Sequence, residues 1–342
     1  MGTLLSEPIT AMVVEECTCE SWSASSASMQ GWRKTHEDAH IFECSCGGPE
    51  PSGVFVVLDG HGGKVAADHS RDILKELLVP LMQRGSLDKT TAEEELRRIF
   101  INTDERLRAK LPIEDKSGTT VVAALVTRTS SNYCIHLAHA GDSRALVCAA
   151  GGVIHASEDH KPSRQDETER IRAAGGFVDH GPYGGGPLRV DGTLAVSRAF
   201  GDFHFKPSDR APDACKVTPL PEVRTVFAAP GDWILIACDG IFDVFSNDEA
   251  RTFIASRLLE GELTNGSAVV KQLLNSCLEK GSKDNCTAML IQLRPDCPVK
   301  PYQRTLDVGA YRSIQNDEVL RKYREFFEAE GFTDPQLQNA QD

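Results

Sequence analysis

Short apolar runs that end beside an acid and a glycine recur along the chain. Three runs share this pattern: FVVLDG at 55–60, IHLAHAGD at 135–142 and WILIACDG at 233–240. Runs of this length and composition predict buried strands. A carboxylate at the end of a buried strand is costly unless its charge is offset. Together with Glu37, Asp38 and Asp284, these acids therefore indicate an oxygen-rich site for hard divalent cations such as Mg²⁺ or Mn²⁺.

The spacing of apolar residues predicts the remaining elements. Helices are expected over 64–82, 91–111, 167–174 and 317–329. An entry strand is expected over 21–28, and further strands over 119–127, 133–139, 144–149, 233–238 and 287–293. Because few β-α-β alternations are visible, the separate runs of strands and helices favour an α+β class.

The last predicted helix has an apolar face formed by Val319, Leu320, Tyr323, Phe326 and Phe327. Charged residues four positions apart line its other side, and Gly331 is expected to end it. We expect the apolar face to dock on the body of the protein itself, and docking on a partner is the alternative.

The segment 164–190 differs from the rest of the chain because it is rich in glycine. It begins with the charged helical piece and continues as GGFVDHGPYGGGPLR. Its composition predicts a mobile flap beside the active site, and a surface insertion is the alternative.

Composition narrows the class of protein. A chain of 342 residues with 40% apolar and 25% charged residues is an ordinary soluble globular protein. The formal net charge of −13 argues against nucleic-acid binding, because that function needs basic patches. No apolar run approaches the ~20 residues needed to span a bilayer. The N-terminus also lacks the basic start and long apolar core of a cleavable secretory signal.

The eleven cysteines predict thiols in a reducing cytosol. Five stand in apolar contexts and are expected in the core: Cys134, Cys148, Cys238, Cys277 and Cys286. A zinc site at Cys17/Cys19 and Cys44/Cys46 is the alternative, although C-x-C is not the spacing of structural zinc sites.

The first six residues, MGTLLS, fit the pattern for N-myristoylation of Gly2. A single acyl chain gives only reversible membrane attachment. We therefore expect a cytoplasmic protein with a reversible membrane-associated fraction. An unmodified N-terminus is the alternative.

Eight motifs in chain order resemble those of a known family. They are GWRKTHEDAH, VVLDGHGG, SGTTVVAAL, AGDSRA, RIRAAGGFV, LRVDGTLAVSRAFGD, ACDGIFDV and KDNCTAML. Their order resembles that of the metal-dependent type 2C protein serine/threonine phosphatases. The resemblance implies a central two-sheet antiparallel β-sandwich with helices on both outer faces. It also implies a monomer that dephosphorylates phosphoserine and phosphothreonine in phosphoprotein substrates.

The extent of the match divides the chain into three parts. We expect an N-terminal arm over 1–20 and a phosphatase catalytic domain over 21–295 that includes the flap. A C-terminal tail over 296–342 would carry the last helix.

The resemblance assigns the acids to two divalent cations, Mg²⁺ or Mn²⁺, which share a bridging water. It implies that Asp59 bridges both cations and that Gly60 offers its carbonyl oxygen to the second, which needs a close approach by a small residue. Asp239 and Asp284 would complete the ligands of the first cation.

Glu37 and Asp38 resemble residues that bind the second cation, largely through water. Three further positions match those of a third, weaker metal site: Thr120, Asp142 and Asp243. Asn285 is expected to support Asp284 rather than to bind metal.

Three residues are expected to act on the substrate itself. Arg33 matches the family's phosphate-binding arginine, and its planar guanidinium can hold two phosphate oxygens. His61 is expected to protonate the leaving oxygen, and orientation of metal-bound water is its alternative role. Arg189 resembles a second substrate-facing arginine near the flap.

Two other functions must be considered. Residues 36–40 spell H-E-x-x-H, the helical zinc signature of metalloproteases, but the extended pattern with a third histidine does not follow. A protease would also leave the other acids unexplained. A catalytically inactive phosphatase fold that serves as a regulatory binding module is the second alternative. It predicts gaps in the metal-binding set, and the sequence contains none.

Overall fold

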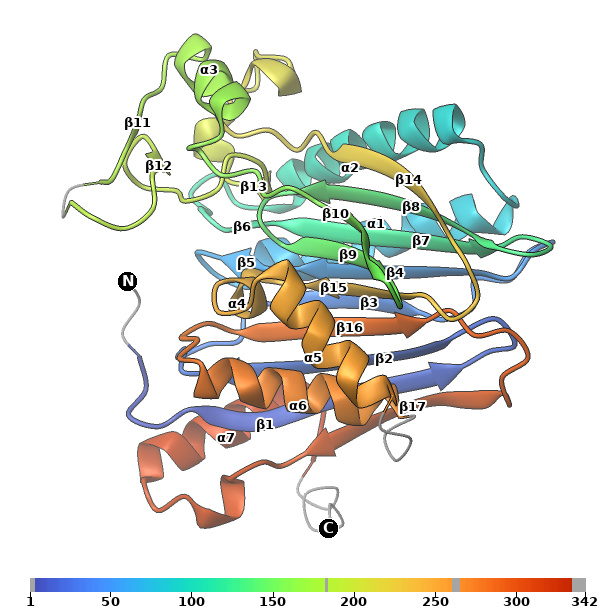
Figure 1. Ribbon diagram of the computed structural model, residues 1–342. Helices are drawn as coiled ribbons and strands as arrows, with labels where there is room; N and C mark the ends of the chain where they lie inside the picture. The colour runs from blue at the N-terminus through green and yellow to red at the C-terminus, as the bar shows by residue number, and fades with distance from the viewer. Residues whose placement is uncertain (1–3, 182–183, 260–264, 334–342) are drawn as a thin grey trace. The chain divides into compact units, whose positions relative to one another are not determined.

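The computed structural model describes residues 4–181, 184–259 and 265–333 (Figure 1). The chain divides into two compact units. Unit 1 comprises residues 1–38, 146–156 and 228–342, and unit 2 comprises residues 39–145 and 157–227. Each unit has its own antiparallel sheet and its own helices.

Unit 1 is built on a seven-stranded sheet with the strand order β10-β9-β15-β16-β2-β1-β17. The strands are β1 (Ile9–Thr18), β2 (Ser23–Gly31), β9 (Arg144–Ala149), β10 (Gly152–Ala156), β15 (Trp233–Ala237), β16 (Cys286–Gln292) and β17 (Lys300–Asp307). β1 pairs antiparallel with β2 and β17, and β16 pairs antiparallel with β2 and β15. Residues expected in a terminal arm and in a tail therefore form strands of this sheet.

The helices of unit 1 lie on both faces of β1. They are α4 (Asp239–Phe242), α5 (Asn247–Leu259), α6 (Gly266–Glu279) and α7 (Asp317–Ala329), with a 3₁₀ turn at Tyr311–Ser313. Successive side chains of a strand point to opposite faces. Ala11 and Val13 pack with α7, whereas Val14 and Glu16 line a cavity with residues of α6. Hence α6 and α7 cover opposite faces of this strand.

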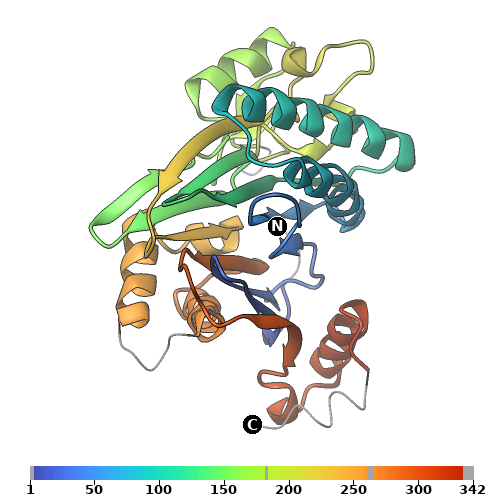
Figure 2. The same cartoon turned by 90° about the vertical axis from the view of Figure 1, so that its right-hand side faces the viewer.

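Helix α7 docks on the protein as predicted, and Figure 2 shows it beside β17. Its buried residues are Val319, Tyr323, Phe326 and Phe327. The backbone N–H of Thr10 in β1 donates to the Tyr323 hydroxyl oxygen at 3.0 Å. The helix ends before Gly331, whose φ of +74° favours glycine, and the Phe332 N–H donates to the Phe327 carbonyl at 2.8 Å.

Unit 2 is built on a five-stranded sheet with the strand order β14-β8-β7-β4-β3. Its strands are β3 (Ala39–Glu43), β4 (Ser52–Leu58), β7 (Val121–Arg128), β8 (Tyr133–Ala140) and β14 (Glu222–Ala228). A three-stranded sheet joins β13 (Phe200–Gly201), β6 (Gly118–Thr119) and β5 (Gly60–His61), and a hairpin joins β11 (Val178–Asp179) and β12 (Arg189–Val190). The short strands flank acids of the sequence motifs. Asp59 directly precedes β5, and Asp202 directly follows β13.

Helices α1 (Val65–Gln83) and α2 (Lys89–Lys110) pack side by side against the five-stranded sheet (Figures 1 and 2). The side chains of Val54, Val56 and Leu58 alternate along β4 and share one core with both helices. Asp88 caps α2, because its carboxylate accepts the backbone N–H groups of Thr90 and Thr91. The remaining helical pieces are α3 (Gln165–Ala173) and 3₁₀ turns at Phe203–Phe205 and Pro212–Ala214.

The predicted α+β class with antiparallel sheets and helices is confirmed. The segment predicted as a flap contains α3 and the hairpin of β11 and β12, while its residues 182–183 lie outside the described part. Within the described residues, no helix combines the length and apolar character needed to cross a membrane. All five predicted core thiols are buried: Cys134, Cys148, Cys238, Cys277 and Cys286.

Candidate active site

In unit 1, the loop that follows β2 carries Arg33, Glu37 and Asp38. The Arg33 guanidinium donates through Nη2 to Asp284 Oδ2 at 2.5 Å and through Nε to the Lys283 carbonyl at 3.2 Å. The predicted phosphate-binding arginine and one predicted metal ligand therefore lie in direct contact. The Arg33 side chain remains 44% exposed, so its guanidinium is accessible to a ligand.

Asn285 holds this loop against the start of β16. Its Oδ1 accepts the Glu37 backbone N–H at 2.9 Å. Its Nδ2 donates to the carbonyls of Gln30 at 2.8 Å and Thr35 at 3.0 Å. Because both ends of the amide are used in this way, Asn285 serves as a brace for the backbone around Glu37.

Asp38 is buried, and its carboxylate accepts a hydrogen bond from a neighbouring strand. The Thr287 hydroxyl of β16 donates to Asp38 Oδ2 at 2.6 Å. Glu37 lies nearer to solvent, and the Thr35 hydroxyl donates to its Oε1 at 2.8 Å. Each of the two carboxylates is therefore oriented by a neighbouring hydroxyl.

Asp239 and Asp243 belong to the short helix α4 of the same unit. Asp239 is its first residue and Asp243 follows its last. The glycine between them is required by packing, because a Cβ on Gly240 would lie 2.0 Å from the Asn285 carbonyl oxygen. The ACDGIFD motif thus combines two acids with the only residue that fits this close approach.

In unit 2, Asp59 follows the end of β4. Its carbonyl accepts the Thr120 N–H at 2.9 Å, which fixes the backbone at this turn. Oxygen atoms of the Asp59 and Asp142 carboxylates lie within 4.8 Å of each other. Asp142 is buried and forms an ion pair with Lys161, and the Thr120 hydroxyl lies 2.7 Å from that of Ser143.

This pair of carboxylates fits a divalent cation. Two like charges at such a separation repel each other strongly unless a cation lies near both. Lys161 offsets part of this charge at Asp142. Carboxylate and carbonyl oxygens are the ligands that Mg²⁺ and Mn²⁺ prefer. The donors that each unit supplies, taken separately, therefore have the chemistry expected for these ions.

His61, on β5, is paired with an acid to which the sequence analysis gave no role. Its Nε2 lies 2.7 Å from Oδ2 of the buried Asp202, whose φ of +50° is uncommon outside glycine. A Cβ on Gly118 would lie 2.1 Å from that carboxylate oxygen and 2.5 Å from His61 Nε2. The glycine of the SGTT motif therefore leaves room for the histidine–aspartate pair.

Arg189 lies in the β11–β12 hairpin, where its Nη1 donates to the Thr193 carbonyl at 2.7 Å. His36 and His40 do not form the helical zinc signature, since residues 36–38 are not helical and His40 belongs to β3. The metalloprotease alternative is thereby excluded on geometry, because that signature requires both histidines on one face of a helix.

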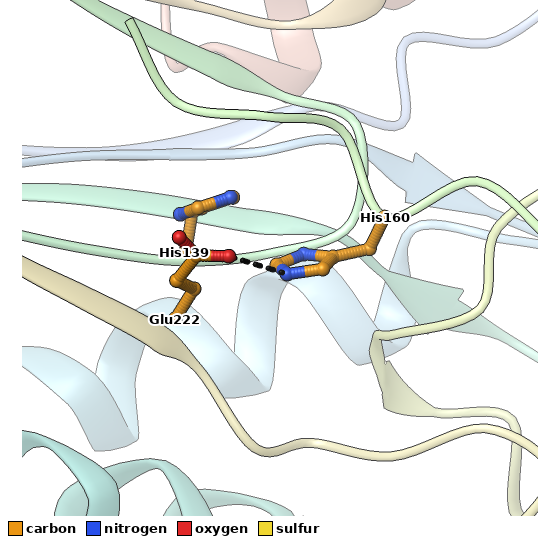
Figure 3. A group of neighbouring side chains, drawn as sticks. All are labelled: His139, His160 and Glu222. Carbon is orange, nitrogen blue, oxygen red and sulfur yellow. Dashed lines mark ion pairs between the residues drawn. The ribbon is translucent and has the colours of Figure 1, made fainter. Parts of the chain in front are cut away.

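A second polar cluster in unit 2 contains His139, His160 and Glu222 (Figure 3). We refer to it as the histidine cluster. The two imidazole rings stack with centroids 4.5 Å apart, and His160 Nε2 lies 3.7 Å from Glu222 Oε2. Burial and the neighbouring His160 lower the pKa of His139 to about 3, and burial also lowers the pKa of His160. Both rings are therefore neutral at physiological pH.

The tautomers of these rings decide what the histidine cluster can bind. His139 Nε2 donates to the Glu158 carbonyl at 2.8 Å, which leaves a lone pair on its Nδ1. His160 Nδ1 accepts the Gly141 N–H at 3.2 Å, so the proton of the neutral ring is on Nε2 and faces Glu222. That nitrogen has no lone pair for a metal ion.

The charges around Glu222 also disfavour a cation. Arg224 Nη2 lies 3.1 Å from its Oε1, and Arg164 Nη1 lies 3.6 Å from its Oε2. The facing N–H of His160 and the charge of Arg224 lower the pKa of Glu222 to about 2. The carboxylate is thus ionised and already compensated. The histidine cluster braces Gly141, next to Asp142, and is not a metal site.

Comparisons with known proteins identify relatives of the chain. The sequence profile of the family described as protein phosphatase 2C matches residues 22–286. The human probable protein phosphatase 1N is 40% identical over 268 residues, which span 78% of this chain and 59% of that protein. A probable protein phosphatase 2C of Caenorhabditis elegans is 35% identical over 302 residues, which span 86% of this chain and 80% of that protein.

Solved structures share the fold. A phosphatase from a pathogenic strain of Toxoplasma gondii has a TM-score of 0.75 at 23% identity and covers 86% of this chain and 99% of its own. A sex determining protein of C. elegans has a TM-score of 0.70 at 26% identity over 82% of this chain and 66% of its own. The resemblance predicted from the eight motifs is confirmed by the profile match across most of the chain. The chain belongs to the protein phosphatase 2C family, whose members are metal-dependent serine/threonine protein phosphatases.

Proposed function

We propose that the chain hydrolyses phosphoserine and phosphothreonine in protein substrates with two divalent cations, Mg²⁺ or Mn²⁺. The observation that carries this proposal is the approach of the Asp59 and Asp142 carboxylates within 4.8 Å in unit 2. Such a grouping of carboxylate oxygens suits a hard divalent cation. Membership of a metal-dependent family supports the same conclusion.

The residues that would hold the ions follow the family's motifs. Asp59 would bridge the two cations, Gly60 would offer its carbonyl to one of them, and Asp239 and Asp284 would bind the other. Further donors for the second and a third, weaker ion are Glu37, Asp38, Asp142, Asp243 and Thr120. When bound, the cations supply a bridging water of lowered pKa and neutralise charge on the phosphate.

The chain's own side chains would complete the reaction. Arg33 would hold two oxygens of the phosphate through its planar guanidinium, and Arg189 would be a second substrate-facing arginine. His61 would give its proton to the departing seryl or threonyl oxygen. Asp202, at 2.7 Å, would stabilise the protonated imidazole and fix its orientation.

Metal removal tests the proposal. Activity on p-nitrophenyl phosphate and on a phosphothreonine peptide should vanish in EDTA and return with millimolar Mn²⁺ or Mg²⁺. Activity that survives chelation, or returns only with Zn²⁺, would contradict the carboxylate-held cations. A chain that binds Mn²⁺ but hydrolyses neither substrate would instead be the inactive binding module.

We also propose a monomeric, cytoplasmic protein with a reversible membrane fraction that depends on an acyl chain at Gly2. Gly2 lies outside the described residues. A single myristoyl chain gives an association constant of only about 10⁴ M⁻¹. No basic residue precedes Arg33, so the first residues provide no second, electrostatic anchor. Intact-mass analysis and fractionation of the Gly2→Ala variant test this, and an unmodified Gly2 would refute it.

A further inference from the structure

The loop that carries Glu37 and Asp38 is in contact with helix α7. The rings of His36 and Phe326 meet with their centroids 5.5 Å apart and their planes at 62°, an edge-to-face arrangement. Phe326 is buried in the apolar cluster that α7 forms with β1. His36 directly precedes the two acids. Helix α7 therefore packs against the residue next to these acids, so a shift of the helix would move the backbone that carries them.

A chain of hydrogen bonds continues from His36 to Asp38. His36 Nε2 lies 2.9 Å from the Ser28 hydroxyl, which lies 2.8 Å from the Thr287 hydroxyl. Thr287 in turn donates to Asp38 Oδ2 at 2.6 Å. The side chains of Ser28, Thr287 and Asp38 are all buried. In such surroundings each bond is strong, and a broken link is expensive.

The direction of every bond in this chain is fixed by its last member. A hydroxyl has one proton, and Thr287 gives its proton to the Asp38 carboxylate. Thr287 must therefore accept from Ser28, and Ser28 must accept from the N–H of His36. All three hydrogen bonds therefore point the same way, from the His36 Nε2–H to the Asp38 carboxylate.

The sheet register places the hydroxyls of this hydrogen-bond series in one row with residues that contact helix α7. Thr287, Ser28, Val13 and Leu306 are cross-strand partners on β16, β2, β1 and β17. Partners in register share one face of a sheet. Val13 and Leu306 belong to the apolar cluster beneath α7, so the hydroxyls that serve Asp38 continue the row on which the helix rests.

From these contacts we infer that helix α7 is a positioning element for Asp38. Phe326 holds the His36 ring, and the ring orients the two hydroxyls that aim the Asp38 carboxylate. The inference rests on the proposed function, in which Asp38 is a donor for the second cation. It assigns to the C-terminal helix an influence on metal affinity, exerted within unit 1.

The test is a titration of Mn²⁺ into the full chain, stripped with EDTA, by isothermal calorimetry. Thr287→Val removes the last donor and should weaken Mn²⁺ binding by about 10–100-fold, as is usual for partners of metal ligands. Phe326→Leu, one step further from Asp38, should weaken it by a smaller factor than Thr287→Val does. In both variants the Mn²⁺ concentration for half-maximal activity should rise, and most of kcat should return at saturating Mn²⁺.

Matched variants separate positioning from simple loss of packing. Phe327→Leu removes an equally buried ring of α7 that contacts Tyr311, Tyr323 and the Phe326 ring itself, and should lower the melting temperature with a smaller loss of Mn²⁺ affinity than Phe326→Leu causes. His36→Gln keeps an N–H donor for Ser28, whereas His36→Phe keeps a ring for Phe326. We expect His36→Gln to bind Mn²⁺ more tightly than His36→Phe.

Three results would overturn the inference. Equal Mn²⁺ affinities for Phe326→Leu and Phe327→Leu would remove α7 from the positioning of Asp38. An unchanged affinity in Thr287→Val, with normal wild-type binding and turnover, would remove the hydrogen-bond chain and leave the proposed function intact. A wild-type chain that neither binds Mn²⁺ nor hydrolyses phosphopeptides would refute the proposed function, and the inference with it.

Discussion

The two polar clusters of unit 2 differ in charge balance although both contain side chains that can bind metals. Asp59 and Asp142 bring two negative charges within 4.8 Å of each other. In the histidine cluster, two neutral rings face one carboxylate that two arginines already compensate. The first arrangement suits a divalent cation, and the second is already balanced without one. Proximity of ligand types alone therefore does not define a metal site, and the proton positions and neighbouring charges decide.

The largest predicted effect tests the carboxylate pair. Asp59→Asn should abolish turnover and weaken Mn²⁺ binding beyond the ~10–100-fold typical of residues that only support a ligand. Calorimetric titration and phosphopeptide hydrolysis measure both effects. Glu222→Gln, in the histidine cluster, is the matched control and should weaken Mn²⁺ binding far less. Similar losses in both variants would erase the distinction between the clusters.

The pair of His61 and Asp202 is a third combination, in which a histidine nitrogen and a carboxylate oxygen lie 2.7 Å apart. His61→Gln should lower the rate on phosphopeptides by about 10²–10⁴-fold, the range for loss of a general acid. The loss should be smaller on p-nitrophenyl phosphate, whose acidic leaving group scarcely needs a proton. Steady-state rates on both substrates measure the difference. Equal losses would assign His61 to orientation of water instead.

The histidine cluster should reveal itself in the pH dependence of stability. His139 has a pKa of about 3 when folded, against 6.5 in the unfolded chain. Between these values the unfolded state binds more protons, so the free energy of unfolding falls as pH decreases. For one such histidine the loss between pH 7.5 and pH 5.5 is about 1.4 kcal/mol.

Urea unfolding of the wild type and of His139→Asn at the two pH values measures this loss. Asparagine does not titrate, so the variant should be less stable overall but should lose about 1.4 kcal/mol less on acidification. A pH dependence identical in both proteins would show that His139 is protonated in the folded state, and would weaken the contrast between the clusters.

The smallest expected effect concerns zinc. In an Asp59→Asn background, where the carboxylate site is impaired, His139→Asn should not change the number of Zn²⁺ ions bound at micromolar Zn²⁺. The reason is the proton on His160 Nε2, which leaves that nitrogen without a lone pair. Metal analysis after gel filtration measures the stoichiometry. Loss of one Zn²⁺ on His139→Asn would show that the cluster does bind metal.

The long elements of the fold could be predicted because their periodicity is strong and local. The helices expected over 64–82, 91–111 and 317–329 correspond to α1, α2 and α7 within two residues at each end. Helix α6 was not predicted, since its sequence GSAVVKQLLNSCLE begins with glycine and serine and contains adjacent valines that also suit a strand. Only packing against β1, β2 and β16 decides in favour of the helix.

The partners of the candidate site residues could not be predicted from the sequence. Asp202 stands at the end of a quoted motif, and an acid after a glycine was the only signal that pointed to it. Its pairing with His61 joins positions 141 residues apart. Likewise, the contact of His36 with Phe326 exists only because α7 returns to β1. The roles of Asp59, Asp239 and Asp284 stay predictions that come from the family's motifs.

The strand order of unit 1 has a consequence for biosynthesis. β1 lies between β2 and β17 in the sheet. Its pairing with β17 therefore cannot form until some 280 further residues have been translated. Unit 2 needs nothing beyond residue 227, whereas unit 1 also requires residues 228 onward. On the ribosome, unit 2 should therefore fold first, while the edge of β1 stays exposed until synthesis of β17 and α7 is complete. During that interval chaperones that bind extended apolar segments would find β1 accessible.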